Sequence, residues 1–310
     1  WLVMSELWKR IRGNADSVQL LRERRASIDA ARQDGVTPLF IASQNGHVNI
    51  VQLLLEKGAS VDVANKDNGT PLYVASQNGH ADIVQMLMNN KASVNAATQY
   101  GVTPLYIASQ NGHTHIVQLF LKMKANIDAS IQDGVTPLFI ASQEGHADIV
   151  QLLLEKGASV DAARQDGVTP LYVASQNGNA DIVQMLLNNK ASVVHTTQGE
   201  TPLYIASQNG HENIVQLLLK MKESVDAVMQ NGATPLYAAT QQGHEYIVHL
   251  LLKAGATWSY LCDSNERVDE NCIRDPINYS CLDTEKGQVF INRYDVKGRT
   301  CYSDRYSHIN

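Results

Sequence analysis

Six histidines recur along the chain at a nearly constant spacing, and imidazole is the side chain that most often binds zinc or moves protons near neutral pH. They are His47, His80, His113, His146, His211 and His244. A zinc ion needs its ligand atoms within about 2 Å, whereas equivalent residues of adjacent packed helices lie about 8–10 Å apart. The regular spacing therefore argues against a metal site. We expect each histidine to hydrogen-bond the backbone of the loop next to Gly46 and its equivalents.

A row of serines is the second candidate for chemistry. Ser43, Ser76 and their equivalents each follow an alanine, but no histidine or acidic residue stands in a triad relation to them. The sequence also contains no glycine-rich phosphate loop, zincin motif or nucleophile elbow. We therefore predict that the protein is not an enzyme and that it has no catalytic residue, metal or cofactor.

All four cysteines lie within the last 49 residues: Cys262, Cys272, Cys281 and Cys301. They could form two disulfides, with three possible connectivities. Zinc fits less well because no Cys-x-x-Cys pair is present. Disulfides would indicate an extracellular protein, and free thiols an intracellular one.

Short runs such as QVFINRYDV, separated by turns that contain glycine, predict a small β-rich segment over residues 259–310.

Composition excludes several classes of function. The chain has 310 residues, 44% of them hydrophobic, and a formal net charge of −6, which is typical of a folded globular protein. A nucleic-acid-binding protein usually carries a basic excess, so we expect no nucleic acid as a partner. No apolar run reaches the roughly 18–20 residues needed to cross a bilayer, so we expect no membrane insertion.

The histidines and serines belong to a repeated unit that contains the triplet Thr-Pro-Leu. The triplets begin at residues 37, 70, 103, 136, 169, 201 and 234, and they contain seven of the eight prolines in the chain. A fixed period of about 33 residues is the signature of a stacked-repeat architecture.

Each unit predicts two short helices. Thr37 is a suitable N-cap, Pro38 suits the first helical position, and Gly46 can end the helix in a left-handed conformation. Apolar residues between 50 and 55 then form the stripe of a second helix, which Gly58 closes. Helices of about two turns are unstable alone in water, so neighbouring units must stack to bury their apolar faces.

The triplets, the Gly-His pairs and the Ile-Val-x-x-Leu-Leu runs together resemble the ankyrin-repeat family over about residues 5–257. The resemblance implies an all-α solenoid of eight stacked helix-turn-helix units. Residues 1–33 would be a degenerate N-terminal capping repeat, residues 34–258 seven repeats, and residues 259–310 a C-terminal cap or small β-rich segment. The family also favours a cytoplasmic location, which disulfides among the four cysteines would reverse.

This chain departs from the family pattern in three systematic ways. Aromatic residues replace the usual histidine after the triplet, and we expect them to form a ladder packed between units: Phe40, Tyr73, Tyr106, Phe139, Tyr172, Tyr204 and Tyr237. Serine replaces the second alanine of the first helix in six units. Lysine replaces the glycine that ends the second helix at Lys91, Lys124, Lys190 and Lys222, and we expect those helix ends to differ slightly from the others.

The resemblance implies a protein–protein interaction scaffold that binds its partner through the concave face of the solenoid. The expected contacts at the turn tips are Gln33, Asp34, Lys66, Asp67, Gln99, Tyr100, Gln132, Asp133, Gln165, Asp166, Thr197, Gln198, Gln230 and Asn231. Those at the ends of the first helices are Gln44, Asn45, Gln77, Asn78, Gln110, Asn111, Gln143, Glu144, Gln176, Asn177, Gln208, Asn209, Gln241 and Gln242.

Two alternative functions remain open. Nearly identical units, with an apolar last repeat, could form a structural array that associates with itself, perhaps extracellular and stapled by C-terminal disulfides. The C-terminal segment could instead be a small effector or toxin-like unit, in which Cys301, Asp304 and His308 are the nearby reactive residues. The uniform amides of the expected binding face fit either a duplication that has not diversified or a partner that is itself extended or repetitive.

Overall fold

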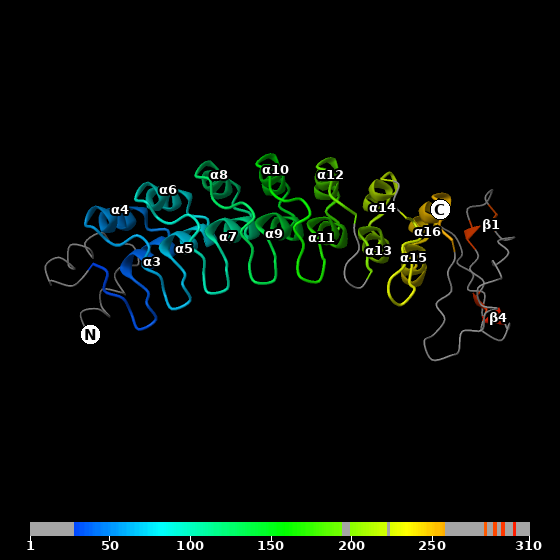
Figure 1. Ribbon diagram of the computed structural model, residues 1–310, viewed down its shortest axis with the longest axis horizontal. Helices are drawn as coiled ribbons and strands as arrows, with labels where there is room; N and C mark the ends of the chain where they lie inside the picture. Colours follow the sequence, from blue (N-terminus) through cyan, green and yellow to red (C-terminus); the bar gives the residue numbers. More distant parts are fainter. Residues whose placement is uncertain are drawn as a thin grey trace.

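The computed structural model describes residues 28–193, 199–221 and 224–257, together with four short strands between residues 282 and 301. Within residues 28–257 the chain forms a row of stacked helix pairs (Figure 1). Each pair begins at a Thr-Pro-Leu triplet, so the predicted 33-residue units are the structural units of the fold.

Each described unit contains a first helix that starts at proline and a second helix that starts after the histidine or asparagine of the next turn. The first helices are α3 (Pro38–Gln44), α5 (Pro71–Gln77), α7 (Pro104–Gln110), α9 (Pro137–Glu144), α11 (Pro170–Gln176), α13 (Pro202–Gln208) and α15 (Pro235–Gln242). The second helices are α4 (Val48–Glu56), α6 (Ala81–Asn89), α8 (Thr114–Lys122), α10 (Ala147–Glu155), α12 (Ala180–Asn188), α14 (Glu212–Leu219) and α16 (Glu245–Lys253).

The predicted helix signals act as expected. Thr37 Oγ1 accepts a hydrogen bond of 3.2 Å from the backbone N–H of Phe40, and the threonine of every other triplet caps its helix in the same way. Because proline occupies the first helical position, its missing N–H leaves no donor unsatisfied. Gly46 adopts φ 76° after the helix, in the left-handed region where a side chain is strained.

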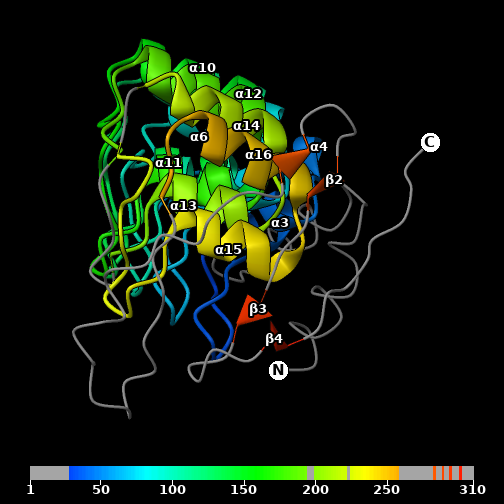
Figure 2. The same cartoon turned by 90° about the vertical axis from the view of Figure 1, so that its right-hand side faces the viewer.

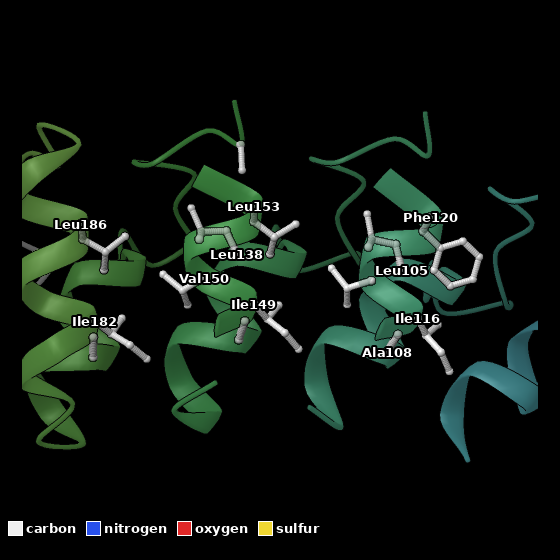
Figure 3. Close-up of a cluster of buried hydrophobic side chains, with 14 of the residues drawn as sticks. Leu105, Ala108, Ile116, Phe120, Leu138, Ile149, Val150, Leu153, Ile182 and Leu186 are labelled. Carbon is white, nitrogen blue, oxygen red and sulfur yellow. The ribbon is translucent and has the colours of Figure 1, made fainter. Parts of the chain in front are cut away.

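The core is continuous from one unit to the next. Figure 3 shows Leu105, Ile116 and Phe120 of one unit beside Leu138 and Ile149 of the following one, and all five side chains are almost completely buried. Burying a leucine, isoleucine or phenylalanine side chain contributes about 1.5–3 kcal/mol. Since each unit buries its apolar stripe against its neighbours, helices of two turns become stable only within the stack.

The stack is curved (Figure 1). The first helices and the turn tips that hang below them follow the inner, concave side of the arc, and the second helices follow the outer side. The end-on view of Figure 2 shows the first and second helices as two layers, with the turn tips projecting beyond the first. The described residues that are expected to bind a partner therefore lie on one side of the row of helix pairs.

The lysine-ended helices keep the left-handed conformation that glycine adopts elsewhere. Lys91, Lys124 and Lys190 have φ values of 67°, 57° and 64°, whereas Gly58 and Gly157 have 82° and 84°. The helix ends thus differ slightly, as predicted, but the chain turns in the same direction at both. Lys222 lies outside the described residues.

The terminal segments leave several expectations open. The predicted capping repeat lies almost entirely outside the described residues, which contain seven of the eight expected units. Between residues 282 and 301, β1 (Leu282–Asp283) pairs antiparallel with β2 (Gln288–Val289), and β3 (Arg293–Tyr294) with β4 (Thr300–Cys301). Two-residue strands do not establish a β-rich segment. The other three cysteines lie outside the described residues, so the disulfides and the domain boundaries stay predictions.

Candidate partner-binding face

The histidines that recur once per repeat join consecutive units. In five units the imidazole Nε2–H donates to a backbone carbonyl of the preceding unit, at the last residue of its first helix. His80 contacts the oxygen of Gln44 at 3.1 Å, and His146 contacts that of Gln110 at 2.9 Å. The predicted backbone bond is therefore confirmed for five of the six histidines, with its acceptor in the neighbouring unit. Within the described part of the chain, no group of three or more metal-binding side chains converges.

The serines of the first helices are buried between helices. Ser76, Ser109 and Ser142 each donate to the backbone carbonyl of the leucine four residues earlier, at 2.7–2.8 Å. Their equivalents are equally buried. A hydroxyl buried in the helix interface cannot reach a substrate, which agrees with the prediction that these serines are packing residues.

Three asparagines at the ends of the first helices differ from the glutamines beside them, because their side chains bond the preceding unit. Asn111 Nδ2 donates to the carbonyl of Gln77 at 3.0 Å, and Asn177 and Asn209 make the equivalent bonds to their own preceding units. Asn111 and His113 thus share one acceptor. These asparagines were expected on the binding face, and the Asn-Gly-His run does not predict their second role, because Asn78 has the same run and donates to Val74 of its own helix at 2.8 Å.

The glutamine side chains remain exposed along the concave face. Gln44, Gln77 and Gln176 are exposed, and Gln110 and Gln208 are partly exposed. No hydrogen bond to another residue of the described chain holds any of these five amides, whereas Gln143 Nε2 donates to Glu144 at 3.0 Å. Each free amide offers one acceptor and two donors to a partner.

The turn tips are linked to one another by backbone hydrogen bonds. The N–H of Lys66 donates to the carbonyl of Asp34 at 2.9 Å, and Gln99 and Gln165 make the same bond to Asp67 and Asp133. Gln99 also donates from Nε2 to Oδ1 of Asp67 at 2.9 Å. The tips therefore form an ordered edge of the concave face. Thr197 and Gln198 lie outside the described residues.

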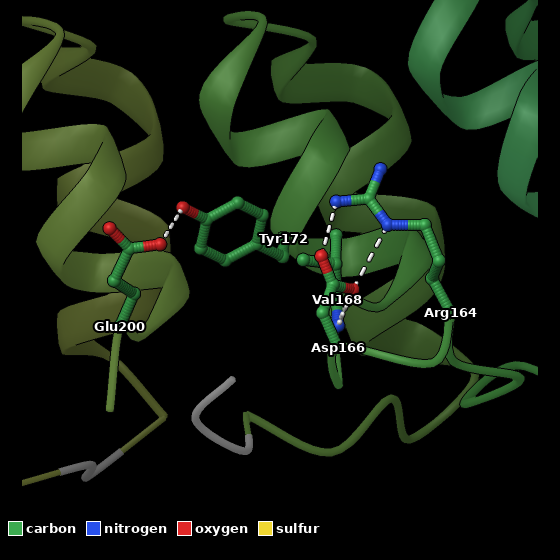
Figure 4. Close-up of polar contacts among 5 residues, drawn as sticks. All are labelled: Arg164, Asp166, Val168, Tyr172 and Glu200. Atoms are coloured by element: carbon green, nitrogen blue, oxygen red, sulfur yellow. Dashed lines mark hydrogen bonds and ion pairs between the residues drawn. The ribbon is translucent and has the colours of Figure 1, made fainter. Parts of the chain in front are cut away.

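Two of the acidic tip residues are neutralised within their own turns. Arg32 pairs with Asp34 at 3.2 Å, and Arg164 Nε donates to Asp166 Oδ1 at 2.9 Å (Figure 4). The hydrogen bond from Arg164 lowers the pKa of the Asp166 carboxyl. Asp67 and Asp133 have no ion-pair partner among the described residues.

The predicted aromatic ladder is present beneath the tips. Phe40, Tyr106, Phe139, Tyr172 and Tyr204 are buried between units, and Tyr73 and Tyr237 are partly exposed. Burial raises the pKa of the Tyr106 phenol to about 12, with smaller contributions from the carboxylates of Glu144 and Asp133. Burial is also the main cause of the raised pKa of Tyr172, and Glu200 adds to it.

A groove of about 510 Å³ lies on the face formed by the first three described units. The rings of Phe40, Tyr73 and Tyr100 line it, together with the amides of Gln44 and Gln77. Its other lining residues are Arg32, Asp34, Val36, Ile41, Asn65, Asp67, Gly69, Val74, Thr98 and Val102. Tyr100 is 62% exposed, the highest value among the exposed large hydrophobic residues of the described chain. Tyr100 was expected at a turn tip, but no pattern in the sequence predicted the groove.

Stacked helix pairs with a concave rim of turns define a helical-repeat solenoid. The family model for ankyrin repeats matches three stretches of the sequence, residues 9–98, 92–164 and 171–262. The chain therefore belongs to the ankyrin-repeat family, whose members are generally protein-interaction modules. A search of curated proteins finds no match to the chain. Within the described residues, every helix is too short or too polar to span a bilayer.

Proposed function

We propose that the protein is a non-enzymatic scaffold that binds a protein partner through the concave face of the solenoid. The observation that supports this proposal most directly is that some polar side chains at the ends of the first helices bond a neighbouring unit and others do not. Asn111 and His113 hold the stack together, whereas the side-chain amides of the neighbouring Gln77 and Gln110 have no hydrogen-bond partner among the described residues. Groups that do not stabilise the fold are the ones available to another molecule.

The spacing of these amides favours a partner that extends along several units. The glutamines recur once per repeat on one side of the arc, and the linked turn tips run parallel to them. Hydrogen bonds from exposed amides are individually weak, about 0.5–1.5 kcal/mol, so useful affinity requires several units to act together. The contacts proposed for the partner are therefore the tips and glutamines of consecutive units.

The absence of enzymatic activity is part of the same proposal. In the described residues, five histidines donate to carbonyls of neighbouring units, and the serines of the first helices are buried in helix contacts. Neither set leaves a nucleophile beside a base, which a covalent mechanism requires.

An experiment that introduces positive charge, with a matched control, tests the proposal. The variant Gln110→Arg with Gln143→Arg places two bulky cations on the concave face, and Gln118→Arg with Gln151→Arg places the same pair on the second helices α8 and α10 of the same units. Partner proteins captured from the native source by the unmodified chain should be retained by the second variant and lost from the first. Unfolding curves would show that both variants fold.

Equal capture by both double variants would overturn the concave-face proposal. Loss of capture from the α8–α10 variant alone would move the binding surface to the outer side of the arc. Each outcome is informative because both variants carry two Gln→Arg substitutions in the same two units and differ only in the side of the arc that they change.

A further inference from the structure

The groove over the first three described units differs from the rest of the concave face. Tyr100 occupies the turn position that Asp34, Asp67, Asp133 and Asp166 occupy in other units. Its ring is 62% exposed and lines the groove beside the partly exposed ring of Tyr73. A large aromatic side chain left in water at a turn tip has no role in the core, so its contribution must be sought in what it can contact.

The charge of the groove is negative. Arg32 and Asp34 form an ion pair, which leaves the carboxylate of Asp67 without a cation among the described residues. Asp67 Oδ1 accepts from Gln99, while no bond within the described chain occupies Oδ2. The next units continue this trend, because neither Asp133 nor Glu144 forms an ion pair with a described residue.

We propose that this groove receives an arginine side chain from an extended segment of the partner protein. The inference rests on the proposed function and names the chemistry that the face recognises. The planar guanidinium stacks on the Tyr100 ring, and its N–H groups donate to the carboxylate of Asp67. Gln44 and Gln77, which also line the groove, bond the backbone of the segment on either side of that arginine.

Arginine fits this groove better than other occupants. A phosphorylated or acidic segment would meet the unpaired carboxylate of Asp67, and like charges at contact distance oppose binding. Lysine is more strongly hydrated and lacks the flat surface that stacks on a tyrosine. A purely apolar segment would bury the Asp67 carboxylate without a partner, which costs free energy. The volume of about 510 Å³ accommodates one long side chain with its flanking backbone.

Selection from a phage-displayed library of random 12-residue peptides, performed on the full chain, tests the inference. The selected peptides should be enriched in arginine over lysine, and replacing that arginine by alanine should abolish binding. In fluorescence titrations of a synthetic selected peptide, Tyr100→Ala should weaken binding about ten-fold. Asp67→Asn, which keeps an oxygen for Gln99, should weaken binding and reduce its dependence on NaCl concentration.

Tyr246→Ala is the matched control. Tyr246 is 48% exposed on α16, far along the stack from the groove, and its loss should leave the affinity unchanged. Because Tyr100 is also exposed, neither substitution opens the core. Thermal unfolding of both variants close to that of the unmodified chain would establish this.

The remaining outcomes separate the two proposals. Peptides without arginine, no enriched peptide, or arginine peptides that bind Tyr100→Ala and Asp67→Asn as tightly as the unmodified chain would each overturn the arginine site. If the peptides selected in either of the other two cases bind the unmodified chain but not the Gln110→Arg and Gln143→Arg variant, the concave face remains the binding surface. If they bind that variant and the two groove variants normally, both proposals fail.

Discussion

The hydroxyl of Tyr172 donates a hydrogen bond of 2.6 Å to Oε2 of Glu200, across the joint between two consecutive units (Figure 4). Tyr172 lies in α11, and Glu200 directly precedes the threonine that caps α13. Tyr106 occupies the equivalent position two units earlier, but its hydroxyl has no hydrogen-bond partner in the described chain. The same residue type therefore makes a joint-spanning bond in one unit and only packing contacts in another.

This difference predicts unequal effects of removing the two hydroxyls. Tyr172→Phe should lower the free energy of unfolding by about 1–2 kcal/mol, because it removes a bond to a charged acceptor that is partly buried. Tyr106→Phe should change it by less than about 0.5 kcal/mol, since Phe139 already fills the equivalent position in the next unit. Urea unfolding at pH 8 measures both. Equal losses would show that the Glu200 bond contributes nothing specific.

Tyr106 also predicts a loss of stability at alkaline pH. Its pKa in the folded protein is about 12, above the ordinary value of about 10, so folding favours the neutral phenol. The resulting stability is fully present below pH 10 and is lost as the pH rises through 12. Between pH 9 and 12, the unmodified chain should lose about 2 kcal/mol more than Tyr106→Phe, as measured by urea unfolding. Tyr100→Phe, at an exposed position, is the control and should follow the unmodified chain.

Much of the fold could be predicted because its signals are local. The helix start needs only Thr37, Pro38 and the N–H of Phe40, all within one turn, and the 33-residue period then repeats the solution. The burial of the aromatic ladder also followed from its fixed place behind the proline. These features depend on neighbours in the sequence, not on how one unit is rotated against the next.

The candidate site was less predictable because its contacts cross the joints between units. The bond from Asn111 to the carbonyl of Gln77 depends on the offset between α5 and α7, which no single repeat specifies. The pairing of Tyr172 with Glu200 and the groove beside Tyr100 have the same origin. The sequence indicated which residues face the concave side, but not which of them the stack itself uses.

The histidine joints predict a difference between two glycine substitutions. A Cβ at Gly112 would lie 2.7 Å from Cε1 of His146, whereas a Cβ at Gly145 would approach Asn179 no closer than 3.3 Å. Both glycines have positive φ, so Gly145→Ala should cost about 1–2 kcal/mol of backbone strain. Gly112→Ala should cost at least about 1 kcal/mol more, because it displaces the imidazole from the carbonyl of Gln110.

Thermal or urea unfolding of the two glycine variants measures that difference. Gly243→Ala provides a second reference, since φ there is also positive and no atom of the described residues lies within 4 Å of the added Cβ. It should match Gly145→Ala. If Gly112→Ala were no worse than these two, the imidazole would be free to move and the histidine bond would contribute little to the joint.

The lysines at left-handed helix ends predict positions where glycine stabilises the protein. Lys124 has φ 57° and an exposed side chain, so Lys124→Gly relieves strain in the folded state without opening the core. Relief of about 1–2 kcal/mol is opposed by about 0.4–1 kcal/mol from the greater freedom of glycine in the unfolded chain, which leaves a gain of about 0.5–1 kcal/mol. Lys124→Ala keeps the Cβ and should give no gain. Urea unfolding distinguishes the two, and equal stabilities for the glycine and alanine variants would mean that the left-handed lysine is not strained.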